Sequence, residues 1–252
     1  MSRLLSELRR LYGLDAGPAS ATTPALIDAE GRTRTLVIEL ARPADWSALA
    51  RLWEGLQADL DWPAPSIAIN GRDGFQLWVS LAEPVTAAQA GALLAALVAR
   101  YLADVPAQRV AQWPGRAESG VAWRHVDLVP REHPGGQWSA FVSPGLAPVF
   151  ADTPWLDIPP GEDGQADLLS GLKSVGGEQL REAVASLGGE RREDAAAQAV
   201  QPAGSPDRAP AASGPQSEPH RFLLQVMNDE RVDMALRIEA AKALLPYAAN
   251  GV

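Results

Sequence analysis

Three polar side chains are the first candidates for chemistry in this chain: Glu39, Gln76 and Asp127. Each lies in a run of alternating apolar and polar residues, and such alternation places the polar positions on one face of a β-sheet. Two carboxylates that meet on one face suit a divalent metal ion and the phosphate chemistry that it supports. The alternative is a solvated sheet face that carries isolated carboxylates and has no function.

Two tryptophans and a histidine are expected on the same face: Trp78, Trp123 and His125. The tryptophans are either covered by an additional strand or loop, for which residues 137–157 are the candidate, or exposed as platforms for bases. His125 and His133 are too few and too far apart in the chain to indicate a zinc site.

The elements that must position these residues alternate between strands and helices. A β-branched run predicts a strand over residues 35–40, and Pro43 and Asp45 favour the start of a helix directly after it. Two further strands, over residues 66–70 and 75–81, are joined by a turn that carries an Asn-Gly signal.

A second helix and a fourth strand follow. Thr86 and Gln89 have the spacing of a capping box, and apolar residues then recur at helical spacing through Leu97 to Leu102. Alternation over Ala122–Val129 predicts the fourth strand, with Val126 and Leu128 directed at the helices.

This order of elements predicts an α+β fold with a β-α-β-β-α-β core, the ferredoxin-like or RRM-like arrangement. Both helices would cover one face of a four-stranded antiparallel sheet, and the other face would be open. In the usual strand order, the strands that carry Glu39 and Gln76 lie at the centre.

Composition divides the chain into four parts. Residues 1–25 contain a short amphipathic helix and a connection, and residues 26–187 form the α+β domain. Residues 188–219 are rich in Gly, Pro, Ala and charged residues, which predicts a disordered linker. Residues 220–252 become periodic and apolar again, which predicts a helical hairpin as an interaction tail.

Charge and cysteine content exclude several functions. The 252 residues carry a net charge of −9, and the only lysines are Lys173 and Lys242. General attraction to nucleic acid is therefore not expected, although a local site is compatible with this composition. The absence of cysteine excludes disulfides, thiolate zinc sites and cysteine catalysis. We find neither a secretory signal nor a membrane span, so a cytoplasmic protein without a membrane partner is expected.

Several segments, in this order, resemble the archaeo-eukaryotic primase-like superfamily, in particular the primase-polymerase domains of mobile elements. That family has an acidic motif on an early strand, a Gly-rich turn that leads into a His-x-Trp strand, and an acidic residue on a later strand. The matching segments here, within residues 26–160, are Leu36–Leu40, Asn70–Trp78, Val126–Arg131, Ser143–Leu146 and Trp155–Asp157.

The resemblance assigns roles to five residues. It implies that Glu39 and Asp127 are catalytic and bind the metal, Mg²⁺ or Mn²⁺ if the protein is active. It implies that Gln76, Trp78 and His125 contact a nucleotide.

Two departures from the family pattern predict impaired catalysis. Ala41 stands where the family has its second acid, and Gln76 stands where it has a phosphate-binding histidine. The leading hypothesis is therefore a mobile-element protein that acts as a primase-like accessory or as a nucleotide- or DNA-binding module in DNA replication. The alternatives are an active nucleotidyl transferase with a reduced acidic set, and a structural interaction protein related to phage packaging.

The tail is similar to a segment of small terminase subunits from tailed phages and their prophages. Two apolar stripes would face a protein partner, another copy of the chain, or the body of the same chain. The predicted docking residues are Phe222, Leu223, Val226, Met227, Leu236, Ile238, Leu244 and Leu245.

Overall fold

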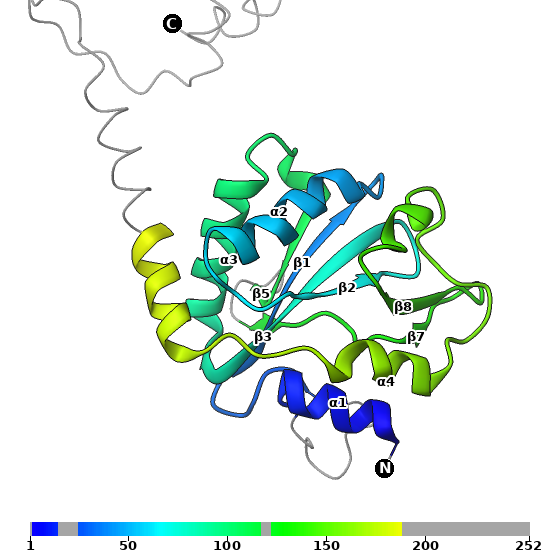
Figure 1. Cartoon of the computed structure of the whole chain (residues 1–252), viewed down its shortest axis with the longest axis horizontal. Coiled ribbons are helices and arrows are strands. Elements are labelled where there is room, and N and C mark those ends of the chain that lie inside the picture. Colours follow the sequence, from blue (N-terminus) through cyan, green and yellow to red (C-terminus); the bar gives the residue numbers. More distant parts are fainter. Residues whose placement is uncertain (1, 15–24, 117–121, 188–252) are drawn as a thin grey trace, which may run out of the picture. The chain divides into compact units, whose positions relative to one another are not determined.

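A computed structural model describes residues 2–14, 25–116 and 122–187 (Figure 1). Within these ranges the chain is a mixed α/β structure with five helices and a curled antiparallel sheet. The sheet has six strands in the order β4-β1-β3-β2-β8-β7, and all neighbouring pairs are antiparallel. The six are β1 (Arg32–Ala41), β2 (Ser66–Ile69), β3 (Gly74–Thr86), β4 (Val110–Trp113), β7 (Arg131–Glu132) and β8 (Trp138–Val142).

The helices lie on both faces of this sheet (Figure 1). One face carries α2 (Trp46–Ala58) and α3 (Ala87–Tyr101). The opposite face carries α1 (Arg3–Tyr12) and α4 (Glu162–Ser170). The fifth helix spans residues 177–187 and packs against the first core. A separate two-stranded ribbon pairs β5 (Gly115–Arg116) with β6 (Trp123–Arg124), and Ala107–Arg109 and Ala147–Phe150 form short 3₁₀ turns.

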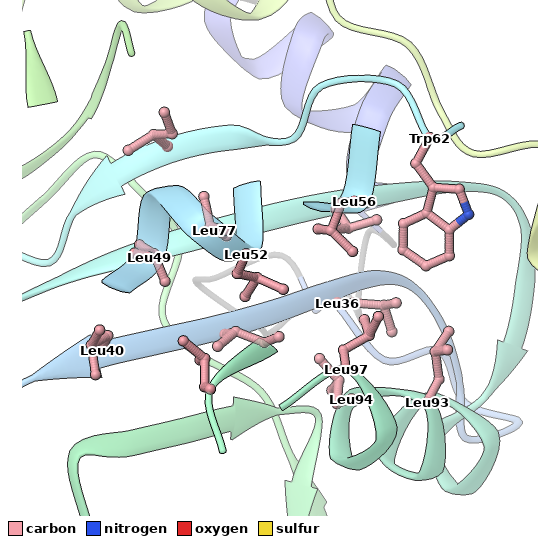
Figure 2. Packing of buried hydrophobic residues seen from close by; sticks show 14 of the residues in the cluster. Leu36, Leu40, Leu49, Leu52, Leu56, Trp62, Leu77, Leu93, Leu94 and Leu97 are labelled. Carbon is pink, nitrogen blue, oxygen red and sulfur yellow. The ribbon is translucent and has the colours of Figure 1, made fainter. Parts of the chain in front are cut away.

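The first core fills the space between the sheet and helices α2 and α3. Figure 2 shows leucines of β1, β3 and both helices gathered in one layer, with Trp62 beside them. The predicted apolar spacing of α3 is confirmed, since Leu97 is fully buried, and α2 buries Leu52 and Leu56 in the same core. Burial of this apolar surface is the main stabilising contribution of this layer.

Both helices begin near the residues that predicted their starts, although the expected place of Pro43 in the first turn is wrong. The Asp45 side chain accepts the backbone N–H of Ala48 at 3.0 Å, so α2 begins after Asp45 and leaves Pro43 outside. Thr86 and Gln89 form the predicted capping box, in which each side chain accepts the other residue's backbone N–H, at 3.2 and 3.0 Å. These bonds satisfy amide groups that have no partner within the helix.

The prediction of an open sheet face is wrong. A second core lies on that face, where Val37 and Trp78 are buried beneath Leu8, Leu11 and other residues of α1 and α4. The physical reason is that α1 is amphipathic and buries its apolar stripe on the sheet face opposite α2 and α3, against Val37 and Trp78. The alternation correctly separated the residues of β1 and β3 into two faces.

The fourth strand was predicted at the wrong place. Val110–Trp113, and not Ala122–Val129, pairs with β1 at the edge of the sheet. In the later segment only Trp123–Arg124 are extended as a strand, and they pair with β5. Val126 and Leu128 alternate because they pack against the second core from a loop, and not against α2 and α3.

The segment at residues 137–157 provides only part of the expected cover, through the contact of Phe141 with Trp78. Its strand β8 extends the sheet beside β2, where Phe141 lies opposite Ala68 and contributes to the second core. The rest of the cover comes from α1 and α4. The predicted linker at 188–219 and tail at 220–252 lie outside the described residues. None of the helices in the described ranges combines the length and apolarity needed to cross a membrane.

Candidate functional site

The sheet brings two of the three predicted site residues together. Glu39 on β1 lies directly opposite Gln76 on β3 in the antiparallel register. The Gln76 side chain donates a hydrogen bond from Nε2 to Glu39 Oε2 at 2.6 Å. The close contact follows from strand pairing, since facing side chains of adjacent strands have Cβ atoms about 5 Å apart.

The other end of the Gln76 amide is also engaged. Its Oε1 accepts a hydrogen bond from Trp78 Nε1 at 2.9 Å, and both residues are buried, with 3% and 1% of their surface exposed. A chain of hydrogen bonds therefore runs from the indole through the amide to the Glu39 carboxylate. Within this arrangement the amide contacts protein groups at both ends.

Trp78 belongs to an aromatic cluster in the second core. Its ring centroid lies 5.2 Å from that of Tyr12 and 5.8 Å from that of Phe141, and both pairs meet edge to face. Tyr12 also shares a hydrogen bond with Ser66, and burial raises its pKa above the ordinary value. A base could stack on Trp78 only if α1 moved away.

Glu39 is half-buried and has no second carboxylate beside it on the neighbouring strands. Its partner on β3 is Gln76, and its partner on β4 is Ala111. In residues 2–14, 25–116 and 122–187 there is no group of three or more His, Cys, Asp or Glu residues arranged to hold a metal ion. A metal at Glu39 would therefore depend on water or substrate for most of its ligands.

Asp127 lies in the loop between β6 and β7, and not on a strand adjacent to β1. Its carboxylate is 62% exposed and forms an ion pair with Arg131. The residue lines a shallow hollow of about 280 Å³ together with Leu26 and Trp123. The three-strand arrangement predicted for Glu39, Gln76 and Asp127 is therefore wrong for Asp127.

His125 connects this loop to the sheet through a hydrogen bond with β1. Its Nδ1 accepts the backbone N–H of Val126 at 2.9 Å, which leaves Nε2 to donate to the carbonyl of Thr35 at 3.2 Å. Burial lowers the pKa of His125 from 6.5 to about 4. The ring is therefore neutral near pH 7, and both of its nitrogens contact the protein.

The sequence did not predict that Arg72, Arg131 and His133 lie close together, a group called the cationic cluster below. Arg72 in the β2–β3 turn and Arg131 on β7 both lie near the ring of His133, close enough to lower its pKa. The available signal was the i, i+2 spacing of Arg131 and His133, which places both on one side of an extended chain. Their proximity to Arg72 depends on the pairing of β8 with β2, which the sequence did not predict.

A larger hollow than the one beside Asp127 lies elsewhere. It is an apolar groove of about 530 Å³ between α3 and the helix at residues 177–187, lined in part by Leu93, Leu180 and Val184. None of the predicted site residues lines it. We therefore place the candidate site at Glu39, Gln76 and the neighbouring turn region.

Comparison with known proteins adds no relative, since no protein-family model matches the chain and no curated protein matches it significantly. Function must therefore be inferred from the residues and their geometry.

Proposed function

We propose that this chain is a degenerate primase-like protein of a mobile element that acts as a nucleotide- or DNA-binding accessory module and not as a nucleotidyl transferase. Support for the primase-like part comes from Glu39 and Gln76, which lie side by side on β1 and β3, where the resemblance expects an active centre. The order β4-β1-β3-β2, with α2 and α3 on one face, is compatible with a ferredoxin-like core.

The observation that supports a non-catalytic role is the state of the Gln76 side chain. Its amide is buried and hydrogen-bonded at both ends, to Glu39 and to Trp78. A phosphate could bind Gln76 only by replacing one of these bonds. Two-metal phosphoryl transfer also requires ligands for two ions, and Glu39 has only Gln76 and Ala111 as strand neighbours.

A primer-extension assay tests this proposal directly. The full chain is incubated with Mg²⁺ or Mn²⁺, labelled nucleotides and a primed template, and no extension is expected. Glu39→Gln and Asp127→Asn are assayed beside Glu54→Gln, which changes an exposed glutamate of α2. Extension that is lost in E39Q or D127N but kept in E54Q would overturn the proposal and restore the active transferase.

Binding is measured separately, with a fluorescent single-stranded oligonucleotide and with a fluorescent nucleotide. We expect at least one of the two to bind the full chain, with an affinity that falls as the salt concentration rises. If neither probe binds, the accessory-binding function is wrong.

A second candidate is a structural interaction protein, and the covered second face favours it. Both faces of the sheet are buried by helices, so the sheet offers no broad open surface to a ligand. In this candidate the tail at residues 220–252 carries the function. Deleting residues 188–252 should then abolish self-association or partner capture, measured by mass in solution, and an unchanged mass and partner set would contradict it.

A further inference from the structure

The β2–β3 turn presents an arginine in a fixed position. Asn70 Oδ1 accepts three consecutive backbone N–H groups, from Arg72, Asp73 and Gly74, at 2.9, 2.9 and 3.0 Å. These bonds hold the turn closed, while the Arg72 side chain is exposed. The turn therefore displays one guanidinium group from a rigid loop.

The neighbouring β7–β8 hairpin presents one more cation, Arg131, and the imidazole of His133 beside this turn. Arg131 donates its backbone N–H to Ser139 Oγ at 2.8 Å, and His133 donates its own to the Gln137 carbonyl at 2.8 Å. Arg131 lies on β7 and His133 directly follows that strand, close enough for the Arg131 charge to lower the pKa of the imidazole.

The two loops are in close contact at a glycine. Gly71 has φ +76°, and a Cβ atom at this position would lie 2.5 Å from Cδ2 and 2.9 Å from Nε2 of the His133 ring. A glycine is needed there for its conformation and for this close approach. The contact places the imidazole one residue from Arg72.

Charges of both signs surround this cluster, since Asp73 adjoins Arg72 and Glu132 adjoins Arg131 in the chain. Burial of the His133 ring, followed by the charges of Arg72 and Arg131, lowers its pKa, whereas Asp127 and a hydrogen bond with the Asn70 backbone act in the opposite direction. Asp127 is the anionic group identified near the ring, and it is paired with Arg131 in an exposed ion pair. Exposed ion pairs of this kind typically contribute about 0–1 kcal/mol, so a stronger anion can replace Asp127.

We propose that Arg72, Arg131 and His133 form a binding site for a phosphate group of a nucleotide or of a nucleic-acid strand. Guanidinium groups bind phosphate oxygens through paired N–H donors, and the imidazole adds a third donor that gains a proton beside a dianion. This site would bind the phosphate of the nucleotide or DNA named in the proposed function, and it rests on that function only for the source of the phosphate. Asp127 is then a competing counter-ion and not a metal ligand.

Inorganic phosphate is the first probe, because it tests the site without any nucleic acid. The His133 ring of the full chain is titrated by NMR in chloride and in phosphate at equal ionic strength. Phosphate should raise the pKa of His133 and leave that of His125 unchanged. Arg72→Gln and Arg131→Gln should each remove the shift, and Arg51→Gln, which changes an exposed arginine of α2, should not.

The Asp127→Asn substitution distinguishes a phosphate site, in which Asp127 competes with the ligand, from a metal site, in which Asp127 binds the ion. Removal of the competing carboxylate should tighten phosphate binding several-fold, whereas loss of a metal ligand would weaken any metal-dependent binding. The proposed phosphate site is wrong if the pKa of His133 is the same in phosphate and in chloride. It is also wrong if the D127N variant binds phosphate more weakly than the unchanged protein.

Oligonucleotides then identify the source of the phosphate. The full chain is mixed with ATP, with a 5′-phosphorylated single strand, or with the same strand ending in a 5′-hydroxyl. The R72Q substitution should lower the affinity of the chain for the preferred probe about tenfold, which corresponds to the loss of one charge-assisted hydrogen bond.

Two outcomes distinguish the site from the proposed function. If phosphate shifts His133 but neither ATP nor either strand binds, the phosphate site is supported and the nucleotide- or DNA-binding function is wrong. If a strand binds equally well to R72Q, R131Q and the unchanged protein, the function is supported and the site is wrong.

Discussion

The sheet face beneath α2 and α3 is packed mainly with aliphatic side chains, whereas the face beneath α1 and α4 combines aromatic rings with buried hydrogen bonds. On the second face, Thr35 Oγ1 donates to the Tyr12 carbonyl at 3.1 Å, and Ser80 Oγ donates to that of Leu11. These carbonyls belong to the last turn of α1, where the helix itself provides no partners. Polar residues on a sheet face can thus bind a covering helix as well as a ligand.

The largest expected effect tests whether the second face is a true core. Tyr12→Ala removes a buried ring that contacts Trp78 and Phe141, and it should lower the free energy of unfolding by about 3–5 kcal/mol. Tyr12→Phe is the matched control, since it keeps the ring and loses only the hydrogen bond to Ser66, which contributes about 1 kcal/mol. Urea denaturation measures both. Equal losses for the two variants would show that α1 is only loosely attached.

A substitution on the first face makes the comparison quantitative. Leu97 is fully buried against the sheet, and Leu97→Ala should cost about 2–5 kcal/mol. Val184, which is 53% exposed, provides the control, because Val184→Ala should change stability by less than about 0.5 kcal/mol. Both faces belong to one cooperative unit if L97A and Y12A each unfold in a single transition. Two separate transitions in either variant would divide the faces into independent units.

The smallest effect concerns the loop that His125 joins to the second face. Because the pKa of His125 is lowered from 6.5 to about 4, the unfolded chain takes up a proton in this interval while the folded chain does not. The contribution of the neutral His125 ring to the free energy of unfolding should therefore be fully present above pH 6.5. It should fall by about 1–3 kcal/mol as the pH drops towards 4.

His125→Gln isolates this contribution from the carboxylates and from His133, whose pKa is also lowered. The difference in unfolding free energy between the unchanged protein and H125Q should shrink between pH 6.5 and 4. A difference that stays constant over this range would mean that His125 is protonated equally in both states.

Local patterns in the sequence were sufficient for the central elements. The Asn-Gly turn located β2 and the start of β3, Pro43 and Asp45 indicated α2, and the capping box with the apolar spacing behind it located α3. The same patterns placed Glu39 and Gln76 on one face, because alternation along a strand depends only on the backbone.

Long-range pairing limited the rest of the prediction. Val110–Trp113 is a short strand and alternates less regularly than Ala122–Val129, yet it is the segment that pairs with β1, after α3 and the 3₁₀ turn at Ala107–Arg109. The cover of the second face comes from residues at both ends of the described chain, and no local pattern links α1 with Phe141 or α4. The cationic cluster depends in the same way on β8 joining the sheet beside β2.

The contacts of α1 have a consequence for the order in which the chain is completed during synthesis. Arg10 donates to the carbonyls of Leu169 and Leu172, about 160 residues later, and Tyr12 stacks on Phe141. The first core, by contrast, draws most of its residues from 36–102. The strands and helices of that core can therefore pack while the ribosome is still translating. We expect α1, although it precedes that core in the chain, to complete its packing only after α4 has emerged, so that Trp78 and its neighbours lack their full cover until then.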